Sequence, residues 1–225
     1  MKWVDWTFIV VSALATGCSP STAANLPRQR LVVTTGAVDE IGGGQLHVDE
    51  GGMRAEILGF HYDDVEMDFV YRGPSHVTTP LANGEVRRQI GLRLHAQNTC
   101  NLVYVMWHVE PKPAIVVSVK RNEGQSEHFE CGARGYAKVE PQSFDVPPIV
   151  DRGERHRLRA RIEGEMLRVD ADGMRVWEGK LPREAFEIEG PAGVRSDNGA
   201  FDFALRLPSA GKPTGERFTY RTTDR

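Results

Sequence analysis

The sequence predicts an all-β protein whose strands form a two-sheet antiparallel jelly-roll sandwich. Short runs in which apolar and polar residues alternate recur about every ten residues, and Gly, Pro, Asn or Asp bound them. Between residues 31 and 207 hardly any segment has the apolar spacing of a helix. Because each alternating strand has one apolar face, many such strands bury that face when two sheets pack against each other.

Three neighbouring segments show the alternation most clearly. They are 90–97, 102–109 and 114–121. In the middle segment, Tyr104, Met106 and His108 alternate with valines and a tryptophan, so one strand face is apolar and the other is mixed. We assign Trp107 and Trp177 to the core because their same-side neighbours along the strand are apolar.

The second half of the domain continues with hairpins. Residues 158–162 and 167–169 flank a Glu-Gly-Glu turn, and Asp172-Gly173 marks the next turn. Residues 193–198 are predicted to turn the chain, through Asp197-Asn198-Gly199, into the last long strand.

Residues 1–18 have the layout of a secretory signal peptide, with Lys2 followed by a short apolar stretch and small residues. Ala15-Thr16-Gly17-Cys18 resembles the bacterial lipobox, in which a peptidase cuts before a lipid-modified Cys, although Ala15 stands where Leu is usual. We therefore predict an exported lipoprotein of the bacterial cell envelope, anchored to the membrane through Cys18 on its periplasmic or surface side. Cleavage at Ala15, which releases a soluble exported protein, is the alternative.

The remaining segments follow from composition. Residues 19–30 are small, polar and proline-containing, as in a linker. Residues 31–207 are expected to form the sandwich domain, and 208–225 a flexible C-terminal tail.

The formal net charge of −3 gives no net attraction to nucleic acid. Apart from Cys18, the cysteines are Cys100 and Cys131, and an oxidising compartment favours a disulfide between them.

Four segments together resemble the concanavalin A-like lectin and glucanase superfamily, which includes laminin G-like modules. They are 91–95, 120–126, the hairpin at 172–179 and the closing GPAGVRSDN with its alternating strand. The similarity covers roughly residues 30–207. It implies a concanavalin A-like sandwich and a sugar ligand in a concave groove, without a mechanism. Glucanases of this superfamily often hold a structural calcium with an Asp of the last strand, which makes Asp202 a calcium candidate, with a salt bridge or water contact as the alternative.

One acidic run is the best candidate for catalytic residues in the sequence, because retaining glycosidases need two neighbouring carboxylates. Asp64, Glu66 and Asp68 alternate along one strand face. By the resemblance, however, this run matches the strand before the catalytic one, and 102–109 in the catalytic place offers no carboxylate. We therefore expect no catalysis, and the acids serve equally as a solvated outer face. A divergent glycoside hydrolase or lyase, using these acids or a Tyr104–His108 acid/base pair, remains the alternative.

The mixed strand faces supply a candidate ligand-binding groove. Its residues are Arg93, His95, Tyr104, Met106, His108 and Lys120. Tyr104 and Met106 would be platforms for sugar rings and the others donors, and the positive charge suits an acidic or phosphorylated glycan. In the alternative, Arg93 and Lys120 pair with acids such as Glu66 or Asp68 across the sheet.

Two further groups have alternative interpretations. His95 and His108 could face each other on adjacent strands as a metal pair, or simply form hydrogen bonds. The arginines between 152 and 161 form a basic ridge that is either a solvated face or a contact for lipid headgroups or polyanions.

These observations predict an exported lipoprotein that binds carbohydrate or another cell-envelope ligand without transforming it, and that needs no cofactor besides the calcium candidate. The alternatives are the hydrolase or lyase and a purely structural surface module.

Overall fold

A computed structural model of the chain describes residues 25–208 and 212–213. The predicted signal peptide with Cys18, the first residues of the linker and most of the C-terminal tail lie outside these described residues. In the described part, no helix is long and apolar enough to cross a membrane.

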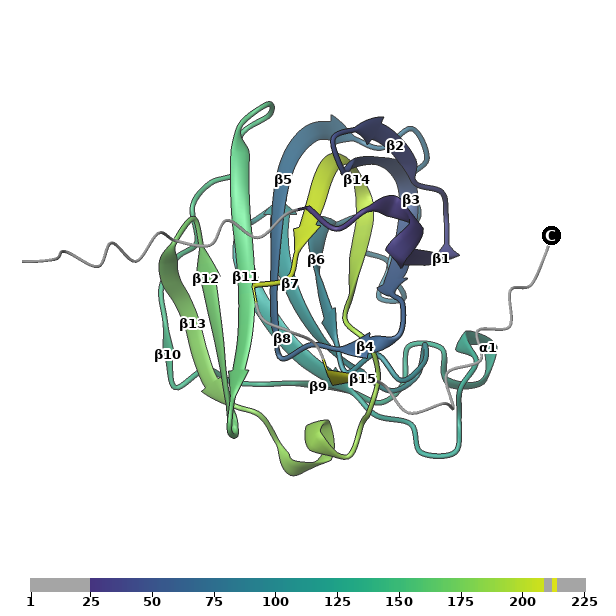
Figure 1. The fold of residues 1–225 in the computed structure, drawn as a ribbon, viewed down its shortest axis with the longest axis vertical. Coiled ribbons are helices and arrows are strands. Elements are labelled where there is room, and N and C mark those ends of the chain that lie inside the picture. Colours follow the sequence, from purple (N-terminus) through teal and green to yellow (C-terminus); the bar gives the residue numbers. More distant parts are fainter. Residues whose placement is uncertain (1–24, 209–211, 214–225) are drawn as a thin grey trace, which may run out of the picture.

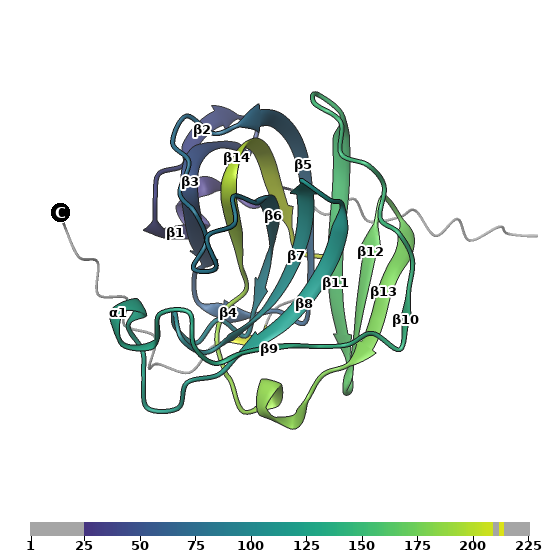
Figure 2. The same cartoon turned by 180° about the vertical axis from the view of Figure 1, so that it is seen from behind.

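The strands form one continuous antiparallel sheet that curls into two layers, which Figures 1 and 2 show from opposite sides. The layer here called the β7 layer contains β1 (Leu31–Thr35), β6 (Arg88–Leu94), β7 (Leu102–Glu110), β8 (Ala114–Lys120), β9 (Tyr136–Lys138), the last part of β3 (Gln45–Ile57) and the first part of β14 (Gly193–Arg206). The β11 layer contains β2 (Asp39–Gly42), β5 (Asp64–Pro74), β10 (Ser143–Phe144), β11 (Arg155–Glu163), β12 (Met166–Ala171), β13 (Met174–Lys180), the first part of β3 and the last part of β14. The smaller elements are β4 (Phe60–His61) with its partner β15 (Lys212–Pro213), α1 (His128–Cys131), and the 3-10 turns η1 (Arg28–Arg30) and η2 (Arg183–Phe186).

Strand β14 joins the two layers. Its residues 193–197 pair with β3 and β6, and from Gly199 onward it pairs with β5 and β3. At the change of partners Asn198 has a φ of 56° and is fully buried, and its amide accepts from Thr79 N and donates to Thr79 O. The prediction of a turn at 193–198 was therefore wrong, because this segment is a paired strand whose bend lies at Asn198.

The apolar faces of both layers meet in one core, as the alternation predicted. Phe69 of β5 packs edge-on against Trp107 of β7, with ring centroids 5.3 Å apart. Trp107 and Trp177 are both buried in this core, as expected. Burial of a large apolar side chain stabilises the fold by about 1.5–3 kcal/mol, so the sandwich is held mainly by these alternate positions.

The predicted hairpins are also present, since β11 pairs with β12 and β12 with β13. The strand predicted at 90–97 is shorter, because β6 ends at Leu94 and His95 has a φ of 50°. This left-handed residue interrupts the extended backbone and turns the His95 side chain off the strand face.

Both ends of the described domain differ from the predicted boundaries. Asn25 forms a bridge with Arg206, and the buried Leu26 donates its backbone N–H to Leu205 O at 2.7 Å. Residues 25–30, predicted as linker, therefore belong to the folded domain. In the predicted tail, Lys212–Pro213 pairs with β4.

The predicted disulfide between Cys100 and Cys131 is present. It connects the loop before β7 to α1, and both cysteines are buried.

Candidate ligand-binding face

The outer face of the β7 layer, opposite the core, carries a cluster of charged and aromatic side chains that we call the Arg–Tyr cluster. It consists of Arg54 and Glu56 on β3, Arg195 and Asp197 on β14, Arg93 on β6, Tyr104 on β7, Lys120 on β8 and Tyr136 on β9. Alternation places these residues outward, since their strand neighbours such as Ala55 and Val194 lie in the core.

Arg93 is the most deeply buried charge of the cluster. Its side chain is 0% exposed and its Nη1 lies 2.8 Å from Oε1 of Glu56, which is 4% exposed. Among the described residues, none of its three side-chain nitrogens makes a hydrogen bond of good geometry. The carboxylate of Glu56 is thus the close counterion that offsets the desolvation of this guanidinium.

Asp197 is the second anionic centre, and three side chains donate to it. Arg195 Nε lies at 2.7 Å, Arg54 Nη2 at 3.1 Å and Gln89 Nε2 at 2.6 Å from its oxygens. Burial by itself would raise the pKa of Asp197, but the charges of Arg195 and Arg54 lower it by more, so the pKa lies below its ordinary value. Asp197 therefore stays charged and fixes both arginines on this face.

Tyr104 and Tyr136 form an aromatic pair beside these arginines. Their rings are stacked with centroids 5.9 Å apart, the Arg195 guanidinium lies 4.9 Å from the Tyr104 centroid, and the Lys120 ammonium lies 5.1 Å from that of Tyr136. Burial raises the pKa of Tyr104, but the charges of Arg195, Arg93 and Arg54 outweigh it, and the pKa falls below its ordinary value. A lowered phenol pKa is the signature of a positive local potential.

Charge is therefore unbalanced in the cluster. It holds four cationic side chains, Arg54, Arg93, Arg195 and Lys120, and two carboxylates, Glu56 and Asp197. The parts that reach solvent are Tyr136, which is 44% exposed, and the side chains of Arg54 and Arg195, which are 22% and 11% exposed.

The predicted groove residues have different positions in the structure. Arg93, Tyr104 and Met106 lie on the expected face but are buried, and Met106 packs with Tyr104 in a small apolar cluster separate from the main core. His108 is partly buried on the same face, and Arg87 lies 3.2 Å from its Nε2. Arg93 and Tyr104 thus belong to the inner part of the Arg–Tyr cluster.

The side chains of Lys120 and His95 are held by backbone carbonyls. The Lys120 ammonium donates to the carbonyls of Thr99 and Gly132 at 3.0 and 2.8 Å, so it ties together two loops beside the disulfide. His95 turns away because of its left-handed backbone, and its Nδ1 lies 2.9 Å from Ala185 O. The hypothesis of a His95–His108 metal pair was wrong, because His108 pairs with Gln89 at the opposite end of β6.

The acidic run lies on the outer face of the β11 layer, away from the Arg–Tyr cluster. Asp64 Oδ2 lies 2.7 Å from Arg159 Nη2, and Asp68 Oδ1 lies 2.7 Å from Arg157 Nε. Glu66 Oε1 lies 3.4 Å from the same Arg157 Nε. Most of the basic ridge is thus a lattice of ion pairs across β5 and β11. Glu66 and Asp68 are therefore not the acids that pair with Arg93 or Lys120, because those cations are on the other layer, but Arg93 does pair with an acid across the sheet, Glu56.

The Tyr104–His108 acid/base pair conflicts with strand geometry. The two residues are four positions apart on the extended strand β7, which separates their Cα atoms by about 13 Å. One substrate proton is not shared over that distance.

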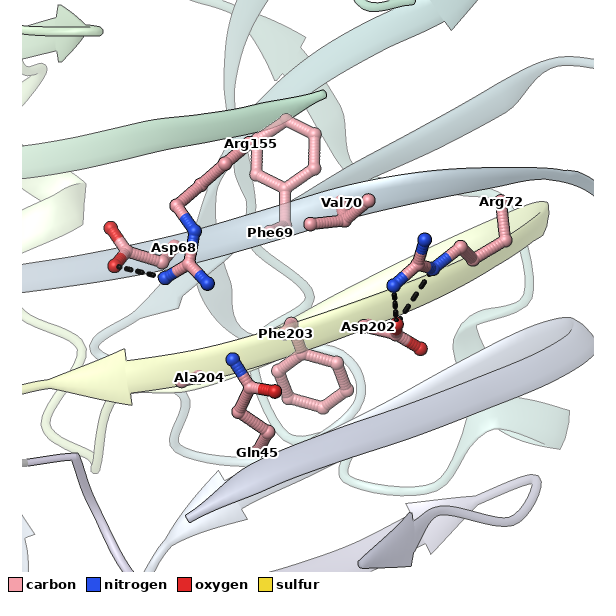
Figure 3. Close-up of a pocket in the computed structure, with 9 residues that line it drawn as sticks. All are labelled: Gln45, Asp68, Phe69, Val70, Arg72, Arg155, Asp202, Phe203 and Ala204. Carbon is pink, nitrogen blue, oxygen red and sulfur yellow. Dashed lines mark hydrogen bonds and ion pairs between the residues drawn. The ribbon is translucent and has the colours of Figure 1, made fainter. Parts of the chain in front are cut away.

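Asp202 lies in a small pocket on the β11 layer, shown in Figure 3. His47 Nδ1 lies 2.7 Å from one carboxylate oxygen, and Arg72 Nε donates to the other at 2.7 Å. In the same pocket Arg155 lies 3.6 Å from Asp68. The pocket volume of about 60 Å³ has room for a few water molecules. The ion pair with Arg72 and the hydrogen bond with His47 correspond to the salt-bridge alternative for Asp202.

Sequence reasoning missed Arg54, Tyr136 and Arg195. Arg195 and Asp197 were interpreted as part of a turn, although they alternate with Val194 and Ser196, as strand residues do. Tyr136 lies on a strand of three residues, too short for its alternation to be recognised.

Comparisons with known proteins inform the fold. No family model matches the sequence, and no curated protein matches it. The chain is similar to the carbohydrate-binding module CBM66 from Bacillus subtilis, with a TM-score of 0.54 and 12% identity over 82% of this chain and 97% of that one. It is also similar to the Caenorhabditis elegans galectin LEC-6, with a TM-score of 0.41 and 8% identity over 72% and 94% of the two chains. The chain thus has a jelly-roll fold, as predicted.

Proposed function

We propose that this domain binds an acidic or phosphorylated carbohydrate at the Arg–Tyr cluster and does not transform it. The observation that carries the proposal is the excess of four cations over two carboxylates on one largely buried strand face. Buried charge without a counterion is costly, so an anionic ligand group would be stabilised there. Arg54 and Arg195 are the donors that such a group reaches first, because their side chains are partly exposed whereas that of Arg93 is fully buried.

The aromatic pair supplies the second requirement of a sugar site. Pyranose rings present an apolar face that packs on aromatic side chains, while a few polar groups bind the hydroxyls. Tyr136 is 44% exposed and held in place by its stacking on Tyr104. A ring on Tyr136 would bring an acidic substituent toward Arg54 and Arg195. The likeness to a carbohydrate-binding module supports the ligand class.

Two observations support binding without catalysis. Asp64, Glu66 and Asp68 are engaged by arginines, and Tyr104 and His108 are too far apart to share a proton. The lowered pKa of Tyr104 favours the lyase alternative, because a readily deprotonated phenol can act as a base.

The test compares matched arginines on the two layers. Arg54 and Arg159 have similarly exposed side chains, 22% and 30%, and each pairs with an aspartate. Binding of uronic, sulfated, phosphorylated and neutral glycans is measured by calorimetry for Arg54→Gln and Arg159→Gln. Loss of one charged hydrogen bond should weaken binding about 10- to 100-fold in Arg54→Gln and leave Arg159→Gln within about 2-fold.

Four outcomes would contradict the proposal. Equal affinity for neutral glycans removes the role of charge, and an effect of Arg159→Gln alone moves the site to the β11 layer. Absence of binding favours a structural module. Release of reducing ends or unsaturated products from a bound glycan, measured in parallel, indicates the hydrolase or lyase.

We further propose that the protein is exported and anchored as a lipoprotein through Cys18. The Cys100–Cys131 disulfide supports export, because such bonds persist in oxidising compartments. Mass spectrometry of the mature N-terminus tests this proposal. A lipidated Cys18 agrees with it, whereas an unmodified N-terminus following Ala15 shows ordinary cleavage.

A further inference from the structure

A separate group of side chains lies where β4, the end of β6 and the start of β14 meet. His61, Asp63 and His95 each direct one ligand-type atom to a common point, and these atoms all lie within 4.8 Å of one another. Strand β4 and the beginning of β14 lie together at the lower end of the molecule in Figure 1. The group is distinct from the Arg–Tyr cluster and plays no part in the proposed carbohydrate site.

Local backbone structure brings the three residues together. His61 and Asp63 are two positions apart just before β5, so their side chains point to the same side. His95 follows β6 directly, and its left-handed backbone, with a φ of 50°, turns the ring toward them. The two imidazole rings have centroids 4.4 Å apart.

Hydrogen bonds determine which ring nitrogens carry protons. His61 Nδ1 lies 3.0 Å from Gly190 O, and His95 Nδ1 lies 2.9 Å from Ala185 O. Carbonyl oxygens only accept hydrogen bonds, so both Nδ1 atoms are donors. Each ring thus turns its Nε2 toward the group, and a carbonyl that holds Nδ1 in this way is the arrangement that orients histidine ligands toward a metal ion.

Both Nε2 atoms lie near the carboxylate of Asp63. Its Oδ1 forms a hydrogen bond of 2.7 Å with His61 Nε2 and lies 3.5 Å from His95 Nε2. The His95 side chain is 5% exposed, and its Nε2 has no hydrogen-bond partner among the described residues. A buried ring nitrogen without a partner is unfavourable, and a cation bound between His95, His61 and Asp63 would satisfy it.

From this geometry we propose that His61, Asp63 and His95 bind a divalent transition metal ion of the zinc class. Metal–nitrogen bonds of 2.0–2.1 Å in a tetrahedral site put ligand atoms about 3.4 Å apart, close to the 3.5 Å between Asp63 and His95. His61 moves back slightly from Asp63, which its 20% exposed side chain permits. Two imidazoles and one carboxylate favour zinc, cobalt or copper over calcium and magnesium, which prefer oxygen ligands. The side chain of Asp63 is 34% exposed, so the site borders solvent.

The test uses untagged full-length protein freed of metal with a chelator. Zn²⁺ binding is measured by calorimetry, and Co²⁺ binding by its visible absorption, which reports coordination geometry. The variants are Asp63→Asn, which keeps the shape of a partly exposed side chain, and His95→Gln. The control is His76→Gln, because His76 also pairs with an aspartate but is 86% exposed and outside the group.

We expect one ion per chain and a tetrahedral Co²⁺ spectrum. Affinity should fall about 100-fold or more in both variants, beyond the 10- to 100-fold loss typical of residues that only orient a ligand, and remain unchanged in His76→Gln. Circular dichroism melting of the metal-free proteins confirms that each variant is folded. Absence of stoichiometric binding by the native protein, or binding retained by a folded Asp63→Asn variant, would overturn the proposal and leave the group as a hydrogen-bonded contact between β4 and β6.

Discussion

The Glu56–Arg93 pair provides the sharpest test of how the Arg–Tyr cluster is held together. Both side chains are almost completely buried, with exposures of 4% and 0%, and the two charges lie 2.8 Å apart. Replacement of Glu56 by Gln keeps the shape of the side chain but removes the nearby negative charge. The cluster then has four cations and Asp197 as its remaining carboxylate.

Breaking a buried ion pair by removal of one partner costs about 3–5 kcal/mol, because the other charge stays desolvated. For a domain of this size, 1 kcal/mol lowers Tm by about 2–4 °C, so Glu56→Gln should lower Tm by about 6–20 °C. Urea unfolding gives the same loss as a free energy.

A double variant separates charge from packing. Adding Arg93→Met to Glu56→Gln removes the unpaired cation, so the double variant should be more stable than Glu56→Gln alone. A loss below about 1 kcal/mol in Glu56→Gln, or a double variant less stable than either single one, would refute the assignment of Glu56 as the counterion of Arg93.

Two further predictions concern stability. Burial, aided by the charge of Arg87, lowers the pKa of His108 to about 4. Between about pH 6.5 and 4 the folded protein therefore binds fewer protons than the unfolded chain. The stability of the fold should fall as the pH drops through this range. His108→Gln should flatten the dependence of Tm on pH there, and an unchanged slope would contradict this assignment. The Cys100–Cys131 bond closes a loop of 31 residues, so replacing both cysteines by Ser should cost about 3–4 kcal/mol in urea unfolding, and a loss below about 1 kcal/mol would show that the disulfide adds little.

The layout of strands could be predicted from the sequence because alternation is a local property. Leu92, Val105 and Trp107 face the core by strand periodicity alone, whichever strands they pair with. The hairpin between β11 and β12 is similarly local, since a Glu-Gly-Glu turn joins adjacent segments. The disulfide could also be predicted, because the two cysteines beyond the predicted signal segment have one available pairing.

The candidate sites could be predicted only in part, because most of their members are distant in the sequence. Arg54, Tyr104 and Arg195 are neighbours through β14, which pairs with β3 on one side and β6 on the other. Periodicity places a side chain on a face but does not say how deep that face is buried, so Arg93 and Lys120 were expected at a groove and are inaccessible.

By itself, then, the sequence determined the fold class, the core residues and the disulfide, each of which depends on local spacing or on simple pairing. The tertiary structure decided which charges meet, as in the pairing of Glu56 with Arg93. It also decided where His95 points, because a single left-handed residue after β6 directs the ring to His61 and Asp63. Contacts of this kind depend on strand order and backbone conformation, and periodicity carries no information on either.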